Sequence, residues 1–190
     1  MKKIICLMVV ALLASPGCAS VKKKVRSVET LKYQTILIMP FTEGNEADQE
    51  LVSNIFYNEM QQYEEIKVID REEMNQQFME ELGLNHPLTT GAVDFTGSAE
   101  GNARRRKVHE LYSADAIIFG SLFVDGEILS LAIQMLDVES GELTLSFTKE
   151  LTASPEAVQT AWTDLTKLTV EKVIAHIQDN RVITSVYKYE

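Results

Sequence analysis

Short runs of apolar residues and segments of alternating polarity predict the strands of this chain. They lie at residues 34–41, 66–70, 116–124, 127–137 and 143–151, and more weakly at 181–190. The first, QTILIMPF, is short, rich in β-branched side chains and stopped by Pro40, as buried strands are. The fourth alternates along its length, which predicts one face in the core and one outside.

Apolar residues that recur at spacings of three and four predict helices between these strands. The helices are expected from Asn45 to Tyr63, at 71–82, at 102–112 and from Ser154 to about Asn180. Asn45 is a suitable N-cap for the first, and Ser154-Pro155-Glu156 is a typical start for the last. In that last helix Trp162 is expected to face the sheet from the centre of the apolar stripe.

The order βαβα(α)βββα predicts an α/β fold of the α+β-like kind. We expect a mixed sheet of five to six strands with helices packed on it. Asp125-Gly126 predicts a type I′ hairpin turn, in which both residues have positive φ. Residues 84–101 form a long loop with three glycines, and loops of that length are commonly functional or disordered.

The first 18 residues have the pattern of a processing signal. Two lysines precede eleven apolar residues, too few to span a bilayer, and Ser15-Pro16-Gly17-Cys18 follows. This segment resembles the bacterial lipoprotein signal, in which the cysteine is acylated and begins the mature chain. The alternative is an ordinary secretory signal cleaved after Ala19, which would leave a soluble periplasmic protein. Ala19 beside the cysteine favours the outer membrane.

The expected domain organisation follows from this signal. Residues 1–18 are the signal peptide, 19–30 are a basic, aperiodic tether, and 31–190 form one folded body. The chain's two cysteines are Cys6, inside the signal, and Cys18. The body therefore has no thiol for a disulfide, for cysteine catalysis or for metal binding.

Four segments of the body resemble one family in their order along the chain. They are ILIMPF at 36–41, KVIDREEMNQQFMEELGL at 67–84, ADAIIFGSLF at 114–123 and LAIQMLDVESGEL at 131–143. They are similar to the CsgG-type periplasmic domain, whose superfamily includes the curli secretion lipoprotein, a lipoprotein activator of a peptidoglycan synthase and the amino-terminal domain of TolB. The resemblance implies an outer-membrane lipoprotein that acts as a non-enzymatic scaffold or accessory subunit in envelope assembly or secretion.

The chain departs from that family in two respects. Its hairpin connections at 125–126 and 139–141 are too short to cross a bilayer, so we do not expect it to form a pore by itself. Its tether is much shorter than the one the synthase activator uses, which makes activation of a peptidoglycan synthase the alternative function. Partners implied are the outer membrane through the lipid anchor, envelope proteins and a possible homo-oligomer.

Charge and motif content exclude several functions. Residues 30–190 carry 12 basic and 27 acidic residues, a net charge of −15, which disfavours nucleic acid as a partner. The three histidines lack metal-ligand spacing, and no nucleophile or phosphate-loop motif occurs. We therefore expect no enzyme activity, metal, cofactor or small-molecule substrate.

A basic cluster stands out in this acidic body. It consists of Arg104, Arg105, Arg106 and Lys107. One interpretation is a solvated face that balances nearby acids. The other is a docking site for an acidic partner or a second subunit, with Phe95 in the preceding loop as an apolar anchor.

Overall fold

The computed structural model of the protein describes residues 23–69, 95 and 98–189. The expected signal segment with Cys18 and the helix expected at 71–82 lie outside the described residues, and so does most of the loop expected at 84–101. The described chain forms two units, one of residues 29–182 and one that pairs the segment before residue 29 with the segment after 182.

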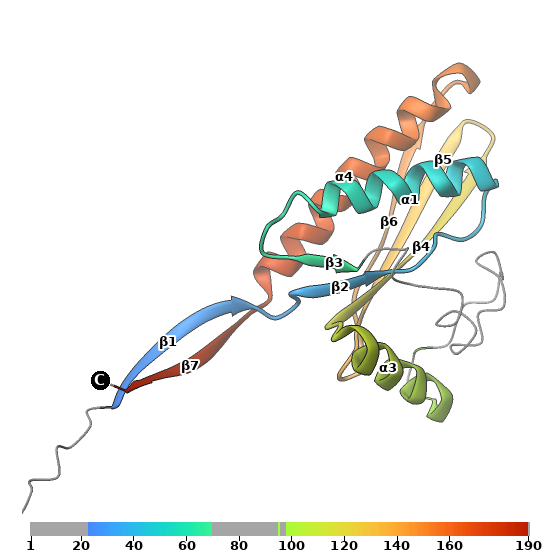
Figure 1. The fold of residues 1–190 in the computed structure, drawn as a ribbon. Helices are drawn as coiled ribbons and strands as arrows, with labels where there is room; N and C mark the ends of the chain where they lie inside the picture. Colours follow the sequence, from blue (N-terminus) through green and yellow to red (C-terminus); the bar gives the residue numbers. More distant parts are fainter. Residues whose placement is uncertain (1–22, 70–94, 96–97, 190) are drawn as a thin grey trace, which may run out of the picture. The chain divides into compact units, whose positions relative to one another are not determined.

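A five-stranded mixed sheet forms the centre of the larger unit, in the order β3-β2-β4-β5-β6 (Figure 1). Its strands are β2 (Thr35–Ile38), β3 (Lys67–Ile69), β4 (Ala116–Asp125), β5 (Ile128–Asp137) and β6 (Leu143–Thr152). Strand β2 runs parallel to both β3 and β4, whereas β4, β5 and β6 are antiparallel neighbours. The predicted α/β class with a mixed sheet is confirmed.

A separate two-stranded sheet pairs β1 (Lys23–Leu31) with β7 (Arg181–Tyr189). Part of the stretch expected to be an aperiodic tether is therefore a strand. The predicted tail strand forms, but it pairs with β1 and not with the main sheet. A two-stranded sheet needs no continuous apolar face, so its residues lack the strong alternation by which strands are recognised.

Three α-helices occur among the described residues. They are α1 (Glu46–Met60), α3 (Ala99–Tyr112) and α4 (Val158–Asp179), the last preceded by the 3₁₀ turn η1 (Pro155–Ala157). As predicted, Asn45 caps α1, because its side-chain oxygen accepts the N–H of Asp48 at 2.9 Å. Helix α3 begins three residues earlier than predicted, since Ser98 accepts the N–H of Gly101 at 2.9 Å. None of the described helices is long and apolar enough to cross a membrane.

The helices cover opposite faces of the sheet and enclose two cores. Helices α1 and α4 pack on one face, where the four alternating residues of β5 (Leu129, Leu131, Ile133 and Met135) are buried as predicted. Trp162 of α4 lies in this core with its side chain fully buried, which confirms its predicted position. Helix α3 packs on the other face through Val108, against Ile117 of β4 and Leu136 of β5.

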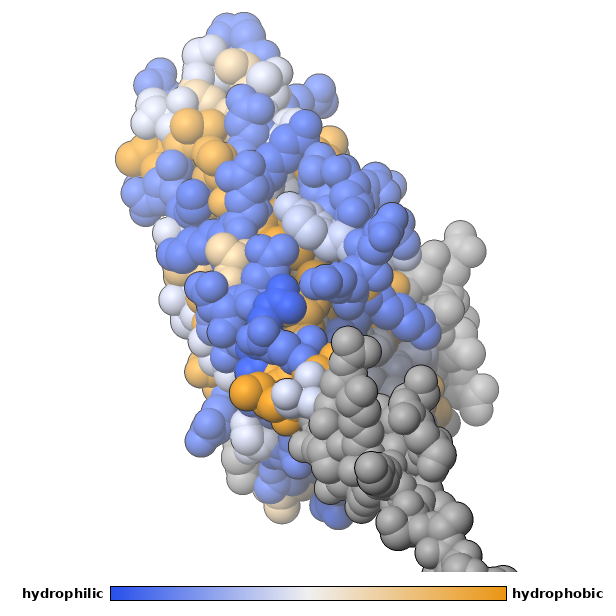
Figure 2. All heavy atoms as spheres, turned by 90° about the vertical axis from the view of Figure 1, so that its left-hand side faces the viewer, coloured by the Kyte–Doolittle hydropathy of each residue, from blue (hydrophilic) through white to orange (hydrophobic). Residues whose placement is uncertain are grey.

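The surface keeps some large hydrophobic side chains. On the face drawn in Figure 2, most of the surface of the described residues is hydrophilic, with small groups of hydrophobic residues between. Phe123, Val124 and Ile128, at the end of the β4–β5 hairpin, are about half exposed. Scattered exposed hydrophobic residues are normal for a folded domain and require no partner.

The turn of the β4–β5 hairpin differs from the prediction. Asp125 is the last residue of β4 and pairs with Ile128, so the two loop residues are Gly126 and Glu127. Gly126 has a φ of +60°, and neither Asp125 nor Glu127 has a positive φ. A positive φ at the first loop residue alone is the pattern of a type II′ turn, which needs glycine only there. The glycine was recognised correctly, but the loop is shifted by one residue.

Candidate functional site

The four residues of the predicted basic cluster all lie on α3, but they do not share one environment. Arg106 is exposed and Lys107 is half-buried. The Arg104 side chain is 21% exposed and forms an ion pair with Glu100, one helical turn earlier. Arg105 is 6% exposed and therefore belongs to the interior. The cluster is thus one buried cation with three cations around it.

Arg105 is held by oxygen atoms from three directions. Its Nε donates to the carbonyl oxygen of Val138 at 3.2 Å, and its terminal nitrogens donate to the carbonyl of Phe95 and the side chain of Asn102. Its guanidinium also lies against the backbone of Gly141, where a Cβ atom would come within 2.2 Å of the Arg105 Cζ. Arg105 therefore joins α3 to the turn that links β5 and β6.

Phe95, the apolar anchor of the predicted docking site, is a buried residue. Its side chain is 1% exposed and lies in the core beneath α3, with its ring centroid 5.4 Å from that of Phe119. The structure brings Phe95 and Arg105 together, but as packed interior residues. Of the predicted contact residues, Arg104, Arg106 and Lys107 retain solvent exposure.

The turn between β5 and β6 is organised by Asp137. Its Oδ1 accepts the backbone N–H of Ser140 at 2.8 Å, and its Oδ2 lies 2.7 Å from the Lys32 ammonium and accepts the Tyr33 hydroxyl at 3.3 Å. Gly141, with a φ of +76°, closes the turn by donating to the carbonyl oxygen of Asp137. The Asp137 side chain is 4% exposed, so a buried carboxylate here requires an ion pair with a cation and these hydrogen bonds.

These contacts shift both ionisations in the direction that keeps the pair charged. Burial by itself raises the pKa of the Asp137 carboxyl. The hydrogen bonds from Lys32 and Ser140 and the positive charge of Lys32 outweigh burial, and they hold that pKa below its usual value. The hydrogen bond to Asp137, and then the contact with Tyr33, raise the pKa of the Lys32 ammonium above its usual range.

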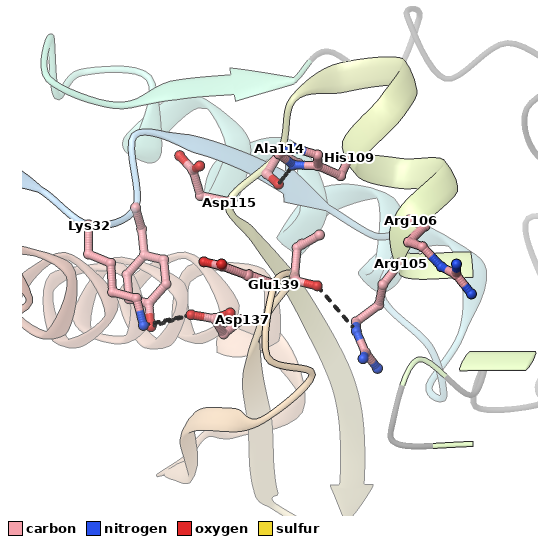
Figure 3. A pocket seen from close by; sticks show the side chains of 10 residues that line it. Lys32, Arg105, Arg106, His109, Ala114, Asp115, Asp137 and Glu139 are labelled. Atoms are coloured by element: carbon pink, nitrogen blue, oxygen red, sulfur yellow. Dashed lines mark hydrogen bonds and ion pairs between the residues drawn. The ribbon is translucent and has the colours of Figure 1, made fainter. Parts of the chain in front are cut away.

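A cavity of about 470 Å³ opens between α3, this turn and the segment that joins β1 to β2 (Figure 3). Its lining side chains come from four places in the sequence: Lys32, Tyr33, Arg105, Arg106, His109, Ala114, Asp115, Asp137, Val138 and Glu139. Figure 3 shows Arg105 and Arg106 on one side and Lys32, Asp115 and Asp137 on the other, with the Arg106 guanidinium directed away from the acidic side chains. Cationic and anionic side chains therefore share one cavity.

Two more lining residues are fixed by backbone contacts. One carboxylate oxygen of Asp115 accepts the N–H groups of both Gln34 and Thr35 at 2.8 Å, which ties the start of β4 to the start of β2. The Nδ1 of His109 lies 3.3 Å from the carbonyl oxygen of Ala114. These contacts with backbone atoms hold Asp115 and His109 in place on the wall of the cavity.

The charged side chains that line this cavity are suited to binding a charged partner. Within the described residues, no group of three histidine, cysteine, aspartate or glutamate side chains is arranged to hold a metal ion. Sequence reasoning missed Lys32, Tyr33, Asp115 and Asp137 as site residues. The signal for Asp137 was present, because it begins the DVESGE turn segment, yet nothing in the sequence indicated that Lys32 would reach it.

Comparison with known proteins gives distant structural neighbours and no family. No protein-family model matches the chain, and no curated protein does. Lipoprotein GNA1162 from Neisseria meningitidis is 15% identical with a TM-score of 0.48, over 74% of this chain and 96% of that one. The PelC dodecamer from Paraburkholderia phytofirmans is 13% identical with a TM-score of 0.45, over 83% of this chain and 98% of that one. The LpoB C-terminal domain from Salmonella enterica is 15% identical with a TM-score of 0.44, over 65% of this chain and 84% of that one.

These neighbours do not assign a function to the chain. Their identities lie far below the level at which site residues are transferable, and their TM-scores indicate only a distant likeness. None of the three is named as a CsgG-type protein, so that specific resemblance stays a prediction. The residues of the site carry the functional inference.

Proposed function

We propose that this chain is a lipoprotein of the bacterial envelope whose folded body acts without catalysis, as a scaffold or accessory subunit that binds another envelope protein. The observation that carries the proposal is the position of Arg104, Arg106 and Lys107. These three cations lie on one helix, beside a charged cavity, in a body of net charge −15.

Helix α3 is suited to binding a partner protein because its inner side is already packed against the rest of the fold. Val108 and Arg105 fix it to the sheet and to the β5–β6 turn. The three cations, of which Arg106 is exposed and Arg104 and Lys107 are partly exposed, are therefore held on a rigid element and need little ordering when a partner binds. In a body with a large negative charge, they favour a partner with an acidic patch and steer its approach.

Membrane attachment rests on the sequence of residues 15–18 and is tested at Cys18. Replacing the thiol in Cys18→Ser should prevent acylation, so the protein should leave the membrane fraction or stay unprocessed. A matched Cys6→Ser variant, changed inside the expected signal, should remain in the membrane fraction. If Cys18→Ser fractionates with membranes as the unchanged protein does, the lipid anchor is refuted.

Partner capture from intact cells tests the contact surface. The triple variant Arg104→Gln, Arg106→Gln, Lys107→Gln should keep nearly the same melting temperature, because charges at the surface and a single helical ion pair such as Arg104–Glu100 contribute little to stability. It should lose most of its partner. The matched control is Lys67→Gln, Lys167→Gln, Arg181→Gln, which removes the same charge from exposed positions on other elements. Equal capture by the two triple variants would contradict the assignment to α3.

The identity of the captured protein separates the functional alternatives. Components of a secretion or assembly machine would support the scaffold role, of which curli-type transport is one form. A peptidoglycan synthase would support the role of a synthase activator. A second copy of the chain would make α3 a subunit interface. Capture that weakens as salt is added would support electrostatic docking, because the Debye length falls to about 8 Å at physiological ionic strength.

A further inference from the structure

Strand β6 is the last strand of the main sheet and has one neighbour among the described strands. It extends for ten residues beside β5, and on its other side it faces none of the strands that the structure describes (Figure 1). It contains no proline, and the one irregularity in its pairing lies opposite Met135 and Leu136, near its start. Short length, prolines and bulges usually protect such an edge, whereas a long regular edge strand is a template for a further strand.

The backbone groups that point outward from β6 can be assigned to particular residues. The N–H of Ala153, directly after β6, donates to the carbonyl oxygen of Glu127. In an antiparallel ladder, residues bonded to the neighbouring strand alternate with residues whose groups point away from it. The odd-numbered residues of β6 back to Leu145 therefore bond to β5. The groups that point to the outer edge belong to four residues with exposed side chains: Ser146, Thr148, Glu150 and Thr152.

Helix α4 continues this outer edge on the face of the sheet that it covers. One flank of α4 faces α1, because Lys167 on it lies 3.7 Å from Glu59. Another flank faces β6, because the Lys172 Nζ lies 4.0 Å from the centroid of the Phe147 ring. Leu168 precedes Lys172 by one helical turn on the same flank and is 45% exposed. A large apolar side chain is therefore left uncovered beside the outer edge of β6.

The spacing of these elements fits a second copy of the chain. If two β6 strands pair in antiparallel orientation, a two-fold axis passes midway between them, and neighbouring strands lie about 4.8 Å apart. Helix α4 packs on both β5 and β6, so its axis would lie about 5 Å from the two-fold axis. The two α4 helices would then be about 10 Å apart, close to the roughly 8–10 Å at which helices pack. Strand pairing and helix packing are satisfied by the same arrangement.

The side chains on the α4 face of β6 are complementary when the axis passes through Thr148. Leu145 then lies opposite Leu151 of the second copy, and both side chains are only partly buried in the single chain. Phe147 lies opposite Lys149 of the second copy, which allows a cation–aromatic contact. Lys149 is the one basic residue of β6, and this register gives its ammonium a favourable neighbour.

Other registers are less favourable. Centring the pair on Lys149 or on Glu150 would set like charges directly opposite each other, which destabilises a sheet. Centring it on Phe147 would set Lys149 opposite a leucine. With Thr148 at the centre, the outer face instead pairs Thr148 with itself and Ser146 with Glu150, and such polar pairs are favourable across strands.

We propose that the chain forms a two-fold symmetric dimer in which β6 pairs antiparallel with β6 of a second copy, centred on Thr148. The two five-stranded sheets join into one sheet of ten strands, and Leu168 packs at the contact between the two α4 helices. Both subunits use the same surface, so the assembly is closed. The inference goes beyond the proposed role of α3 and does not rest on it, because it uses a different surface of the fold.

Sedimentation velocity of the purified protein over a range of concentrations tests the dimer. The unchanged protein should dimerise with a Kd on the order of 10 μM or tighter. Thr148→Lys and Thr148→Glu should each weaken dimerisation about tenfold or more, because two like charges would face each other at a backbone spacing of about 5.5 Å. An equimolar mixture of the two variants should dimerise again, because lysine then faces glutamate across the axis.

Matched variants separate the proposed surface from the rest of the molecule. Gln134→Lys adds the same charge at an exposed position of β5, one strand in from the edge, and should dimerise like the unchanged protein. Leu168→Ala should weaken the dimer about tenfold, because apolar contact is lost from both subunits. Leu111→Ala is its control, since Leu111 is 47% exposed but lies on α3, and it should have no effect.

Several results would overturn the proposal. They are a monomer at all concentrations up to about 100 μM, undiminished dimerisation of the Thr148 variants, a mixture of these variants that stays monomeric, and equal effects of Leu168→Ala and Leu111→Ala. A dimer that only the α3 triple variant disrupts would also contradict it. The substituted side chains are exposed, so melting curves close to that of the unchanged protein are expected and would confirm that the variants are folded.

Discussion

Gly141→Ala should destabilise the protein by much more than the same change at another glycine with positive φ. Gly141 has a φ of +76°, where an alanine costs about 1–2 kcal/mol in backbone energy. Its new Cβ would also come within 2.2 Å of the Arg105 Cζ and must displace that guanidinium. The displaced cation loses hydrogen bonds of roughly 1.5–3 kcal/mol each, so the total loss should be about 3–5 kcal/mol.

Gly126→Ala is the matched control for the backbone contribution. Gly126 has a φ of +60°, and a Cβ built there meets no atom within 4 Å, so its substitution should cost only about 1–2 kcal/mol. Urea denaturation followed by circular dichroism measures both variants. With a slope of about 2 kcal/mol per M, the Gly141 variant should unfold about 1 M below the Gly126 variant.

A double-mutant cycle identifies Arg105 as the cause. In an Arg105→Ala background no guanidinium remains to be displaced, so Gly141→Ala should then cost only the backbone contribution. The expected coupling is roughly 2 kcal/mol, within the usual range for residues in contact. Equal losses at Gly141 and Gly126, or a coupling near zero, would refute the inference that Arg105 locks α3 to the β5–β6 turn.

Two further predictions concern buried residues. Trp162→Ala should lower the free energy of unfolding by about 3–5 kcal/mol in urea denaturation. Trp162→Phe should lower it much less, because the buried Trp162 Nε1 has no hydrogen-bond partner among the described residues. Water-exposed tryptophan fluorescence in the native protein would contradict the position of α4. Asp137→Asn should destabilise the protein at neutral pH, because Asp137 is buried beside Lys32 and its folded pKa is depressed. That stabilisation is complete above the unfolded pKa of about 3.9 and is lost as the pH falls through the folded value, so the two proteins should converge in stability at low pH. A stability difference that persists unchanged at low pH would refute this.

The sequence predicted the main sheet well because its strands follow simple periodic rules. Buried and less buried residues alternate along β5 as far as Met135, and Asn45 supplies a side-chain acceptor of the kind that N-cap positions favour. Strand β1 was missed because a two-stranded sheet buries little on either side. The hairpin loop was misplaced by one residue because Asp-Gly is a strong turn signal, whereas Gly126 alone supplies the positive φ.

The candidate site was predicted less well because its residues meet only in three dimensions. Lys32 and Asp137 are 105 positions apart in the sequence and 2.7 Å apart in the structure, and no local pattern encodes their contact. The run of four cations at 104–107, in turn, is typical of a surface segment. Helical geometry places consecutive residues about 100° apart, so a run of four necessarily points some side chains at the sheet.

The division of that run decides how its function should be tested. Arg105 points inward, where it binds the β5–β6 turn, while Arg104, Arg106 and Lys107 retain solvent exposure on α3. Neutralising all four would remove a buried cation and its hydrogen bonds, so loss of a partner could follow from local unfolding alone. Sparing Arg105 keeps the helix attached, and the three substitutions then remove positive charge from partly or fully exposed positions at the cost of the Arg104–Glu100 ion pair. Loss of binding in that triple variant, with an unchanged melting temperature, therefore reports on contact and not on folding.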